Sequence, residues 1–144
     1  MPVYNAVNTI ERSIKSFQSL SNITKINCRL YIIDDCSNDG SLNKANELSK
    51  GSPNIIIISN KTNIGPGLSR NAALKKIKKG YIGFLDADDE ILPAEYLSAL
   101  NRGIRMGSDW ITFNGWFCNQ NIKSEKYDFD RLIDDSKQLS ASCM

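Results

Sequence analysis

Histidine is absent from this 144-residue chain. The absence excludes, for these residues, nucleophilic mechanisms that pair serine or cysteine with histidine, and it excludes histidine-ligated metal sites. Any acid–base chemistry must therefore rest on aspartate, glutamate, lysine, tyrosine or cysteine.

Cysteine pairs and long apolar runs are also missing. The four cysteines show no Cys-x-x-Cys spacing: Cys28, Cys36, Cys118 and Cys143. This spacing argues against a structural zinc site and favours reduced thiols. No stretch approaches the ~20 apolar residues of a membrane span, and we find no signal-peptide pattern. We therefore expect a cytoplasmic protein, with a place at the inner face of the membrane as an open alternative.

Charge of one sign is not in large excess. The formal net charge of +2 is too small to favour a nucleic-acid partner. One basic run ends a helical pattern: Lys75, Lys76, Lys78 and Lys79. We interpret it as a solvated face with favourable charge at a helix C-terminus. Contact with anionic lipid, and hence peripheral membrane association, is the alternative.

Short apolar runs alternate with amphipathic segments along the chain. Apolar spacing predicts helices at 6–20, 41–49, 67–78 and 93–105. Apolar or β-branched runs predict strands at 29–34, 55–59, 81–85 and 110–115, after a short first strand that ends before Asn5. This alternation is typical of an α/β fold with a doubly wound, mostly parallel sheet and helices on both faces. Ligands of such sheets bind at the carboxyl ends of the strands.

We expect the chain to be truncated at both ends. The first strand has little room before Asn5, and residues 116–144 are polar and weakly patterned. The sequence therefore predicts one domain over 1–115, followed by an incomplete region over 116–144.

An apolar run that stops at three carboxylates, YIGFLDADD at 81–89, is the most informative stretch. Clustered carboxylates repel one another, so the cluster favours a bound cation. Oxygen ligands suit Mg²⁺ or Mn²⁺ better than zinc, and a metal with few protein ligands leaves positions open for phosphate oxygens. The pattern indicates nucleotide-diphosphate chemistry. The alternative is an ordinary loop with Asp89 near a helix start.

A second acidic motif, DDCSNDGS, occupies 34–41. From Asp35 it resembles the start of a calcium EF-hand loop, but Asn46 stands where that loop needs glutamate, so we reject calcium. We interpret Asp35 as the acceptor of a hydrogen bond from a nucleobase imide. The alternative is a turn with Asx hydrogen bonds and a helix cap at Asp39 or Ser41.

A third motif, NIGPGLSRN at 63–71, is a glycine-rich turn that enters a helix. Such a turn can present backbone N–H groups to phosphate, although it matches neither a dinucleotide-binding nor a P-loop pattern. Arg70, near the helix start, can form paired hydrogen bonds to a phosphate or contact a base.

Together with PVYN at 2–5, these motifs resemble the N-terminal, nucleotide-binding half of family-2 glycosyltransferases, which have the Rossmann-like GT-A fold. The resemblance covers residues 1–115 and implies that they bind a nucleotide-sugar, while 116–144 would begin an acceptor-side region. It implies that Tyr4 stacks on uracil and that Pro2 contacts the base through its backbone. It further implies that Asp35 accepts from the base N–H and that Arg70 lies over the base, near the diphosphate.

The resemblance also implies a metal site. Asp88 would be the ligand of Mn²⁺ or Mg²⁺, and Asp86 would bind ribose or help to hold the ion. The ion would neutralise charge on the departing nucleoside diphosphate. The implied activity is transfer of a sugar, with inversion, from a UDP-sugar to a hydroxyl of a glycan or lipid-linked acceptor, as in polysaccharide biosynthesis.

The family's catalytic base has no counterpart here. Family members carry an aspartate or glutamate base well after the region that ends at 115, and nothing in 116–144 matches it. The available carboxylates are Asp128, Asp130, Asp134 and Asp135. We assign the role to none of them, so a truncated, non-catalytic nucleotide-binding fragment is the alternative. A haloacid-dehalogenase-type phosphatase fits poorly because its Asp-x-Asp motif follows an early strand.

Overall fold

The computed structural model describes residues 1–109, 111, 116–119 and 122–126. The chain divides into two compact units, Met1–Ala94 and Glu95–Met144. The boundary near 115, which separates a nucleotide-sugar-binding domain from an acceptor-side region, stays a prediction.

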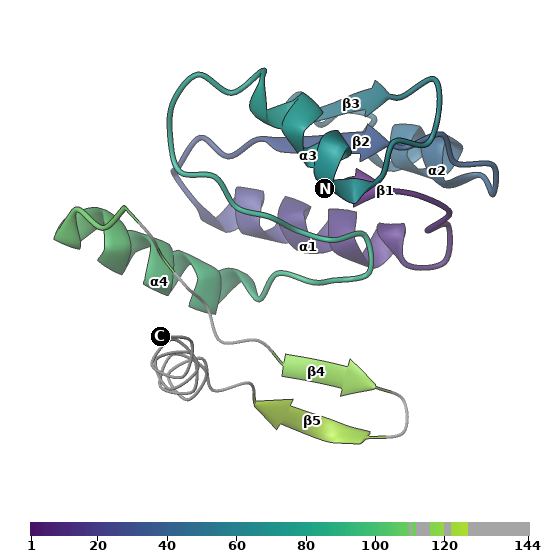
Figure 1. The fold of residues 1–144 in the computed structure, drawn as a ribbon. Helices are drawn as coiled ribbons and strands as arrows, with labels where there is room; N and C mark the ends of the chain where they lie inside the picture. Colours follow the sequence, from purple (N-terminus) through teal and green to yellow (C-terminus); the bar gives the residue numbers. More distant parts are fainter. Residues whose placement is uncertain (110, 112–115, 120–121, 127–144) are drawn as a thin grey trace, which may run out of the picture. The chain divides into compact units, whose positions relative to one another are not determined.

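A three-stranded parallel sheet forms the centre of the first unit (Figure 1). Its strands are β1 (Pro2–Val3), β2 (Leu30–Asp34) and β3 (Ile55–Ser59), and they lie side by side in that order. Leu30 lies opposite Ile55, and the register runs without interruption to the carboxyl ends of β2 and β3. The strands predicted at 29–34 and 55–59 are confirmed.

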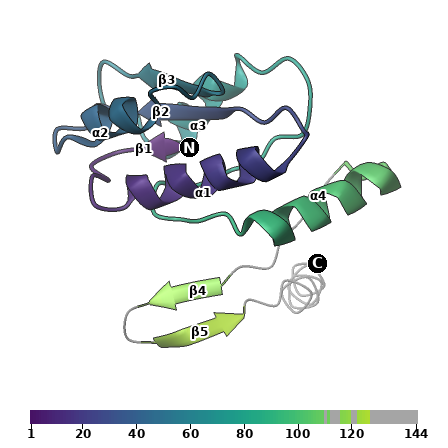
Figure 2. The same cartoon turned by 180° about the vertical axis from the view of Figure 1, so that it is seen from behind.

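Three helices cover the sheet: α1 (Ile10–Ile23), α2 (Ser41–Leu48) and α3 (Pro66–Leu74). α1 and α2 pack against each other, whereas α3 packs against β1 and β2. In Figure 1, α3 lies in front of the sheet and α2 behind it, and Figure 2 shows the reverse. The predicted α/β fold with helices on both faces is confirmed.

The hydrophobic core lies between α1 and the sheet. Ile10, Ile14 and Phe17, at helical spacing along α1, are buried together with Val3 and Ile32 of the strands. Each such side chain contributes ~1.5–3 kcal/mol when it is fully buried. This packing fixes the strand ends from which the functional side chains project.

Two helices, α1 and α3, depart from their predicted bounds by more than one residue, and α1 also extends beyond its predicted end, to Ile23. α1 begins at Ile10 instead of residue 6, because residues 6–9 form a turn in which the Ala6 carbonyl accepts from the Thr9 and Ile10 amides at 3.0 and 2.9 Å. α3 ends at Leu74 instead of residue 78. Four lysines crowd positions 75–79, and like charges three or four residues apart disfavour further helix.

The strand predicted at 81–85 is wrong, since these residues form no strand in the structure. Tyr81, Ile82 and Phe84 are exposed, and only Leu85 of this apolar run is buried. A strand needs a neighbour with unpaired backbone groups, and β1 spans only two residues. The acidic residues that follow nevertheless lie at the edge of the core, beside the buried Ala87.

The second unit begins within α4 (Pro93–Met106) and includes a hairpin of β4 (Trp116–Asn119) and β5 (Ile122–Lys126). α4 matches the helix predicted at 93–105. The strand predicted at 110–115 lies, apart from Ile111, outside the described residues. No helix in the described ranges is both long and apolar enough to cross a bilayer.

Candidate functional site

A cavity of about 470 Å³ opens at the carboxyl ends of β1 and β2. Its volume is within the range of small-molecule sites. All the residues predicted to bind nucleotide or metal line it: Pro2, Tyr4, Asp35, Arg70, Asp86 and Asp88. The fold thus brings together residues that lie up to 86 positions apart, and the wall is completed by Val3, Asn5, Ala6, Thr9, Asn63, Pro66 and Ala87.

The loop after β1 supplies one wall of the cavity. Tyr4 is 52% exposed, so its ring is free to contact a ligand. Asn5 has a φ of 50°, a conformation that asparagine tolerates better than most residues. Its amide donates to Ser37 Oγ at 3.1 Å, and its Oδ1 accepts from the Asn38 amide at 3.0 Å. These bonds fix the loop against the second acidic motif.

Asp39 and Ser41 continue this connection. Asp39 Oδ2 accepts from the Val7 amide at 2.9 Å, and Ser41 Oγ accepts from the Ala6 amide at 2.8 Å. Asp39 Oδ1 accepts from the amide of Ser41 at 2.9 Å and from its hydroxyl at 2.5 Å. Burial raises the pKa of Asp39, but bonds from Ser41 and Val7 outweigh it and lower the pKa. The local turn predicted as the alternative is confirmed for Asp39; the N-cap itself is Gly40.

Asp35 is 2% exposed and accepts three hydrogen bonds. Its Oδ1 accepts from Asn60 Nδ2 at 2.8 Å and from the Ile64 amide at 3.0 Å, and its Oδ2 accepts from the Gly65 amide at 2.7 Å. Burial raises the pKa of Asp35, but the bonds from Ile64, Asn60 and Gly65 outweigh it, so the pKa is lowered. Asp35 is therefore a buried, charged anchor for the turn before α3.

This anchoring changes the role expected of the glycine-rich turn. The Ile64 and Gly65 amides donate to Asp35, and Pro66 has no N–H to offer to phosphate. The turn instead fixes the start of α3, and hence the position of Arg70. Asp35 itself lines the cavity while these donors hold its carboxylate.

Arg70 and Asp86 form an ion pair on the cavity wall. Arg70 Nη2 lies 2.5 Å from Asp86 Oδ1, and the two side chains are 30% and 49% exposed. Such a half-exposed pair is only modestly stabilising. A more highly charged ligand can therefore compete for the guanidinium.

The acidic turn holds charges that repel one another. Partial burial, together with the negative charges of Asp88 and Asp86, raises the pKa of Asp89, and Arg12 offsets part of this rise. Across the described ranges, no group of three or more His, Cys, Asp or Glu side chains could hold a metal. Asp86 and Asp88 nevertheless fit Mg²⁺ or Mn²⁺, because such ions often take one or two carboxylates together with substrate phosphates.

The sequence model of glycosyl transferase family 2 matches residues 1–131 of this chain. This chain belongs to glycosyl transferase family 2. The matched region includes both acidic motifs and Arg70, so the family resemblance predicted from these motifs is confirmed.

The chain is similar to a curated glucosyltransferase and to solved structures of TarS. The chain is 36% identical over 92 residues to a poly(ribitol-phosphate) beta-glucosyltransferase of Bacillus spizizenii, over 63% of this chain and 14% of that protein. The S. aureus TarS structure in complex with UDP has a TM-score of 0.63 at 29% identity, and covers 73% of this chain and 30% of that one. The TarS complex with UDP-GlcNAc has a TM-score of 0.66 at 28% identity, over 75% and 31%. This family-2 chain therefore spans less than a third of each protein.

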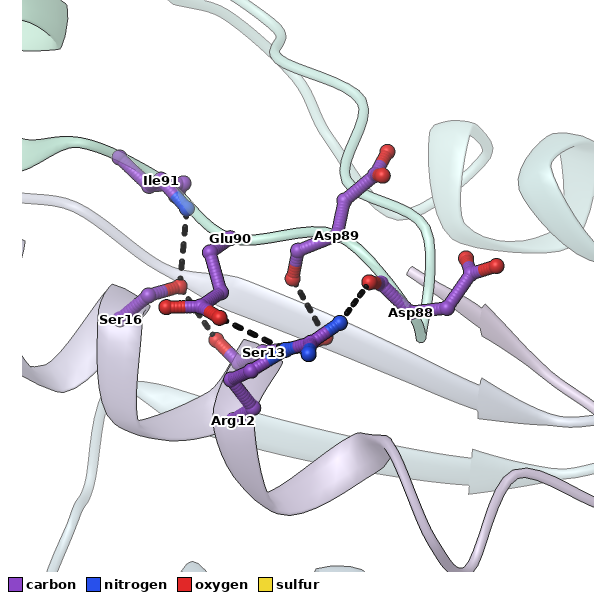
Figure 3. Close-up of polar contacts among 7 residues, drawn as sticks. All are labelled: Arg12, Ser13, Ser16, Asp88, Asp89, Glu90 and Ile91. Atoms are coloured by element: carbon purple, nitrogen blue, oxygen red, sulfur yellow. Dashed lines mark hydrogen bonds and ion pairs between the residues drawn. The ribbon is translucent and has the colours of Figure 1, made fainter. Parts of the chain in front are cut away.

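Sequence reasoning missed three residues of this family-2 chain that contact the acidic turn. They are Arg12, Ser13 and Ser16 of α1 (Figure 3). The signal was available, since Ser13 lies on the apolar face of α1 beside Ile14 and is fully buried. A serine within an apolar helical stripe indicates a hydrogen-bond partner from another segment.

Proposed function

We propose that this chain is the donor-binding part of a glycosyltransferase that moves a sugar from a UDP-sugar to an acceptor hydroxyl. One observation carries the proposal: a single cavity gathers Tyr4, Asp35, Arg70, Asp86 and Asp88. TarS, which shares the fold, has been crystallised with UDP and with UDP-GlcNAc.

The nucleoside is bound by the β1 and β2 ends. The exposed Tyr4 ring stacks on uracil, and Pro2 contacts the base through its backbone. Asp35, which lines the cavity, accepts from the base N–H in addition to its protein donors. Asp86 binds ribose or shares in metal binding.

The diphosphate is bound by Arg70 and a divalent ion. Arg70 turns from Asp86 toward the phosphate oxygens, which carry more charge than one carboxylate. Asp88, with Asp86, holds Mn²⁺ or Mg²⁺. When bound, this ion supplies Lewis-acid stabilisation of the departing nucleoside diphosphate.

For the acceptor, the proposal names only the class of molecule. The acceptor is a glycan or a lipid-linked glycan hydroxyl, and the exposed lysines at 75–79 favour contact with the inner face of a membrane. The carboxylates considered for the base, Asp128, Asp130, Asp134 and Asp135, lie outside the described residues, and the base stays unassigned.

Calorimetric titration of the folded chain with UDP tests the proposal, first with Mn²⁺ and then with EDTA. We expect binding that Mn²⁺ strengthens. Absence of UDP binding, in a chain whose circular dichroism shows native secondary structure, would overturn the proposal. The family match would then reflect common descent without UDP binding.

Tyr4 offers a matched pair of variants for the base contact. Tyr4→Ala is expected to weaken UDP binding, because stacking of a base on an aromatic ring is worth ~1–3 kcal/mol. Tyr4→Phe keeps the ring and is expected to bind UDP like the parent. Equal affinity of both variants would place the base elsewhere.

A further inference from the structure

We propose that Arg12, Ser13 and Ser16 of α1 are positioning residues that hold the acidic turn at 86–91 and thereby set where the Asp88 carboxylate stands. The inference rests on the proposed function, because it concerns the metal-dependent part of donor binding. The three side chains are referred to below as the α1 clamp.

Arg12 holds the turn at two points. Its Nη2 donates to the Asp88 carbonyl oxygen at 2.7 Å, and its Nε lies 2.7 Å from Glu90 Oε1. The two contacts lie on either side of Asp89, so one planar guanidinium fixes both the direction of the backbone and the next side chain (Figure 3).

The two serines bind the backbone between and beyond these points. Ser13 Oγ donates to the Asp89 carbonyl oxygen at 2.6 Å. Ser16 Oγ accepts from the Ile91 amide at 3.0 Å and donates to the Ser13 carbonyl at 2.8 Å. Backbone groups of Asp88, Asp89 and Ile91 thus find their partners on one face of α1.

Burial shows why these positions are serines. Ser13 is 0% exposed and Ser16 is 9% exposed, on the face where α1 otherwise buries Ile14 and Phe17. A buried hydroxyl is costly unless it is hydrogen-bonded, and alanine has the higher helix propensity. The serines are therefore explained by the backbone groups of the turn that they bind.

Other polar contacts of the turn lie at its start, where Asp86 pairs with Arg70 and its carbonyl accepts from the Asp89 amide at 3.2 Å. Residues 81–85, which precede it, form no strand, so no ladder of backbone hydrogen bonds fixes them. The clamp contacts the backbone and Glu90, and in Figure 3 the carboxylates of Asp88 and Asp89 point away from Arg12. The clamp therefore holds the turn and leaves the Asp88 carboxylate available to a ligand.

Substitution of Arg12 tests the clamp without disturbing the core, because its side chain is 56% exposed. UDP affinity is measured with Mn²⁺ and with EDTA for Arg12→Ala and for Lys15→Ala. Lys15 is the matched control, since it is an exposed cation of the same helix that pairs only with Glu11 among the described residues.

We expect Arg12→Ala to weaken UDP binding about threefold to tenfold in Mn²⁺, to leave binding in EDTA unchanged, and Lys15→Ala to change neither. An equal loss in both solutions would indicate general destabilisation and overturn the proposal. Unchanged binding in Mn²⁺ would overturn it too.

Amide hydrogen exchange at Ile91 gives a second readout that needs no ligand. Ser16→Ala removes the acceptor of the Ile91 amide, so this amide is expected to exchange about threefold faster or more, while Ser16→Thr restores slow exchange. Ser49→Ala, which removes the hydroxyl contact of the C-cap residue of α2 to the Ala45 carbonyl, is the control. Unchanged exchange at Ile91 in Ser16→Ala contradicts the clamp. If the parent binds no UDP, the proposed function fails and exchange alone decides whether the turn is held by α1.

Discussion

Two acidic segments border the same cavity and use their carboxylates in opposite ways. At 34–39, protein donors satisfy Asp35 and Asp39, which fasten the loop after β1 and the turn before α3. At 86–89, Asp86 pairs with Arg70, and the Asp88 and Asp89 carboxylates point away from the clamp that holds their backbone. The carboxylates of the first segment hold the loops of the cavity wall in place, whereas Asp86 and Asp88 of the second segment line the cavity as charged groups.

The pKa directions express the same contrast. The pKa values of Asp35 and Asp39 are lowered, because hydrogen-bond donors outweigh burial. The pKa of Asp89 is raised by partial burial and by its acidic neighbours. A carboxylate cluster in this state gains from a cation, whereas a carboxylate that already has its donors gains little.

The largest expected effect comes from removing the anchor of the first segment. Asp35→Ala leaves the Ile64 amide without its acceptor, whereas Asn60 keeps Ser69 Oγ and the Gly65 amide keeps Asn63 Oδ1, so we expect a loss of about 2 kcal/mol in the free energy of unfolding. Urea denaturation measures it, with Asp88→Ala as the control that should change stability little. Equal stability of the two variants would contradict the claim that Asp35 anchors the fold and Asp88 does not.

In the second segment, a substitution should weaken ligand binding strongly and change stability little. Asp88→Asn is expected to weaken UDP binding in Mn²⁺ tenfold or more, because the ion loses a charged ligand. The free energy of unfolding should stay level or rise slightly, since one repulsive charge is removed. Calorimetry in Mn²⁺ and in EDTA, beside urea denaturation, checks both parts. Binding of UDP and Mn²⁺ as tight as in the parent would show that the metal assignment is wrong.

The sequence predicted most of this arrangement because the responsible patterns are local. The strand ending at Asp34, the strand 55–59 and the helix from Ser41 each follow from the spacing of apolar residues. Since parallel strands place their carboxyl ends at one edge, the predicted binding residues had to converge, and they line one cavity.

The rest depends on contacts that local patterns do not encode. The apolar run at 81–85 is a good strand sequence, yet pairing depends on the length of its neighbour, and β1 has two residues. The anchoring role of Asp35 could not be predicted, because the sequence does not show that Ile64 and Gly65 turn their amides toward it. The contact between α1 and the acidic turn joins residues more than 70 positions apart.

The next smaller effect is the loss of stability at low pH, which we expect to come in part from the first segment. Because the folded pKa values of Asp35 and Asp39 lie below the ordinary 3.8, their stabilisation is complete above that pH and is lost as the pH falls through the lowered values. Glu11, whose pKa Lys15 and Lys44 lower to about 2, acts in the same direction. Urea denaturation from pH 6 to about pH 2.5 is expected to show stability falling below about pH 4. Asp39→Asn should make that fall shallower, and an unchanged fall would mean that Asp39 contributes nothing.

The smallest effect concerns the sign of single charges in the acidic turn. Asp89 has a raised pKa, so at pH 7 its negative charge opposes folding, and Asp89→Asn is expected to add roughly 0.2–0.5 kcal/mol of stability after solvent screening. Glu90 differs by one position and pairs with Arg12 at 2.7 Å, so Glu90→Gln is expected to lower stability by a similar amount. Thermal denaturation at low salt and at 1 M salt checks both, and the part of each difference that comes from charge–charge interaction should shrink at high salt. If the two variants shift stability in the same direction, neighbour repulsion does not distinguish these two acids, and the acidic turn holds no stored repulsion for a cation to relieve.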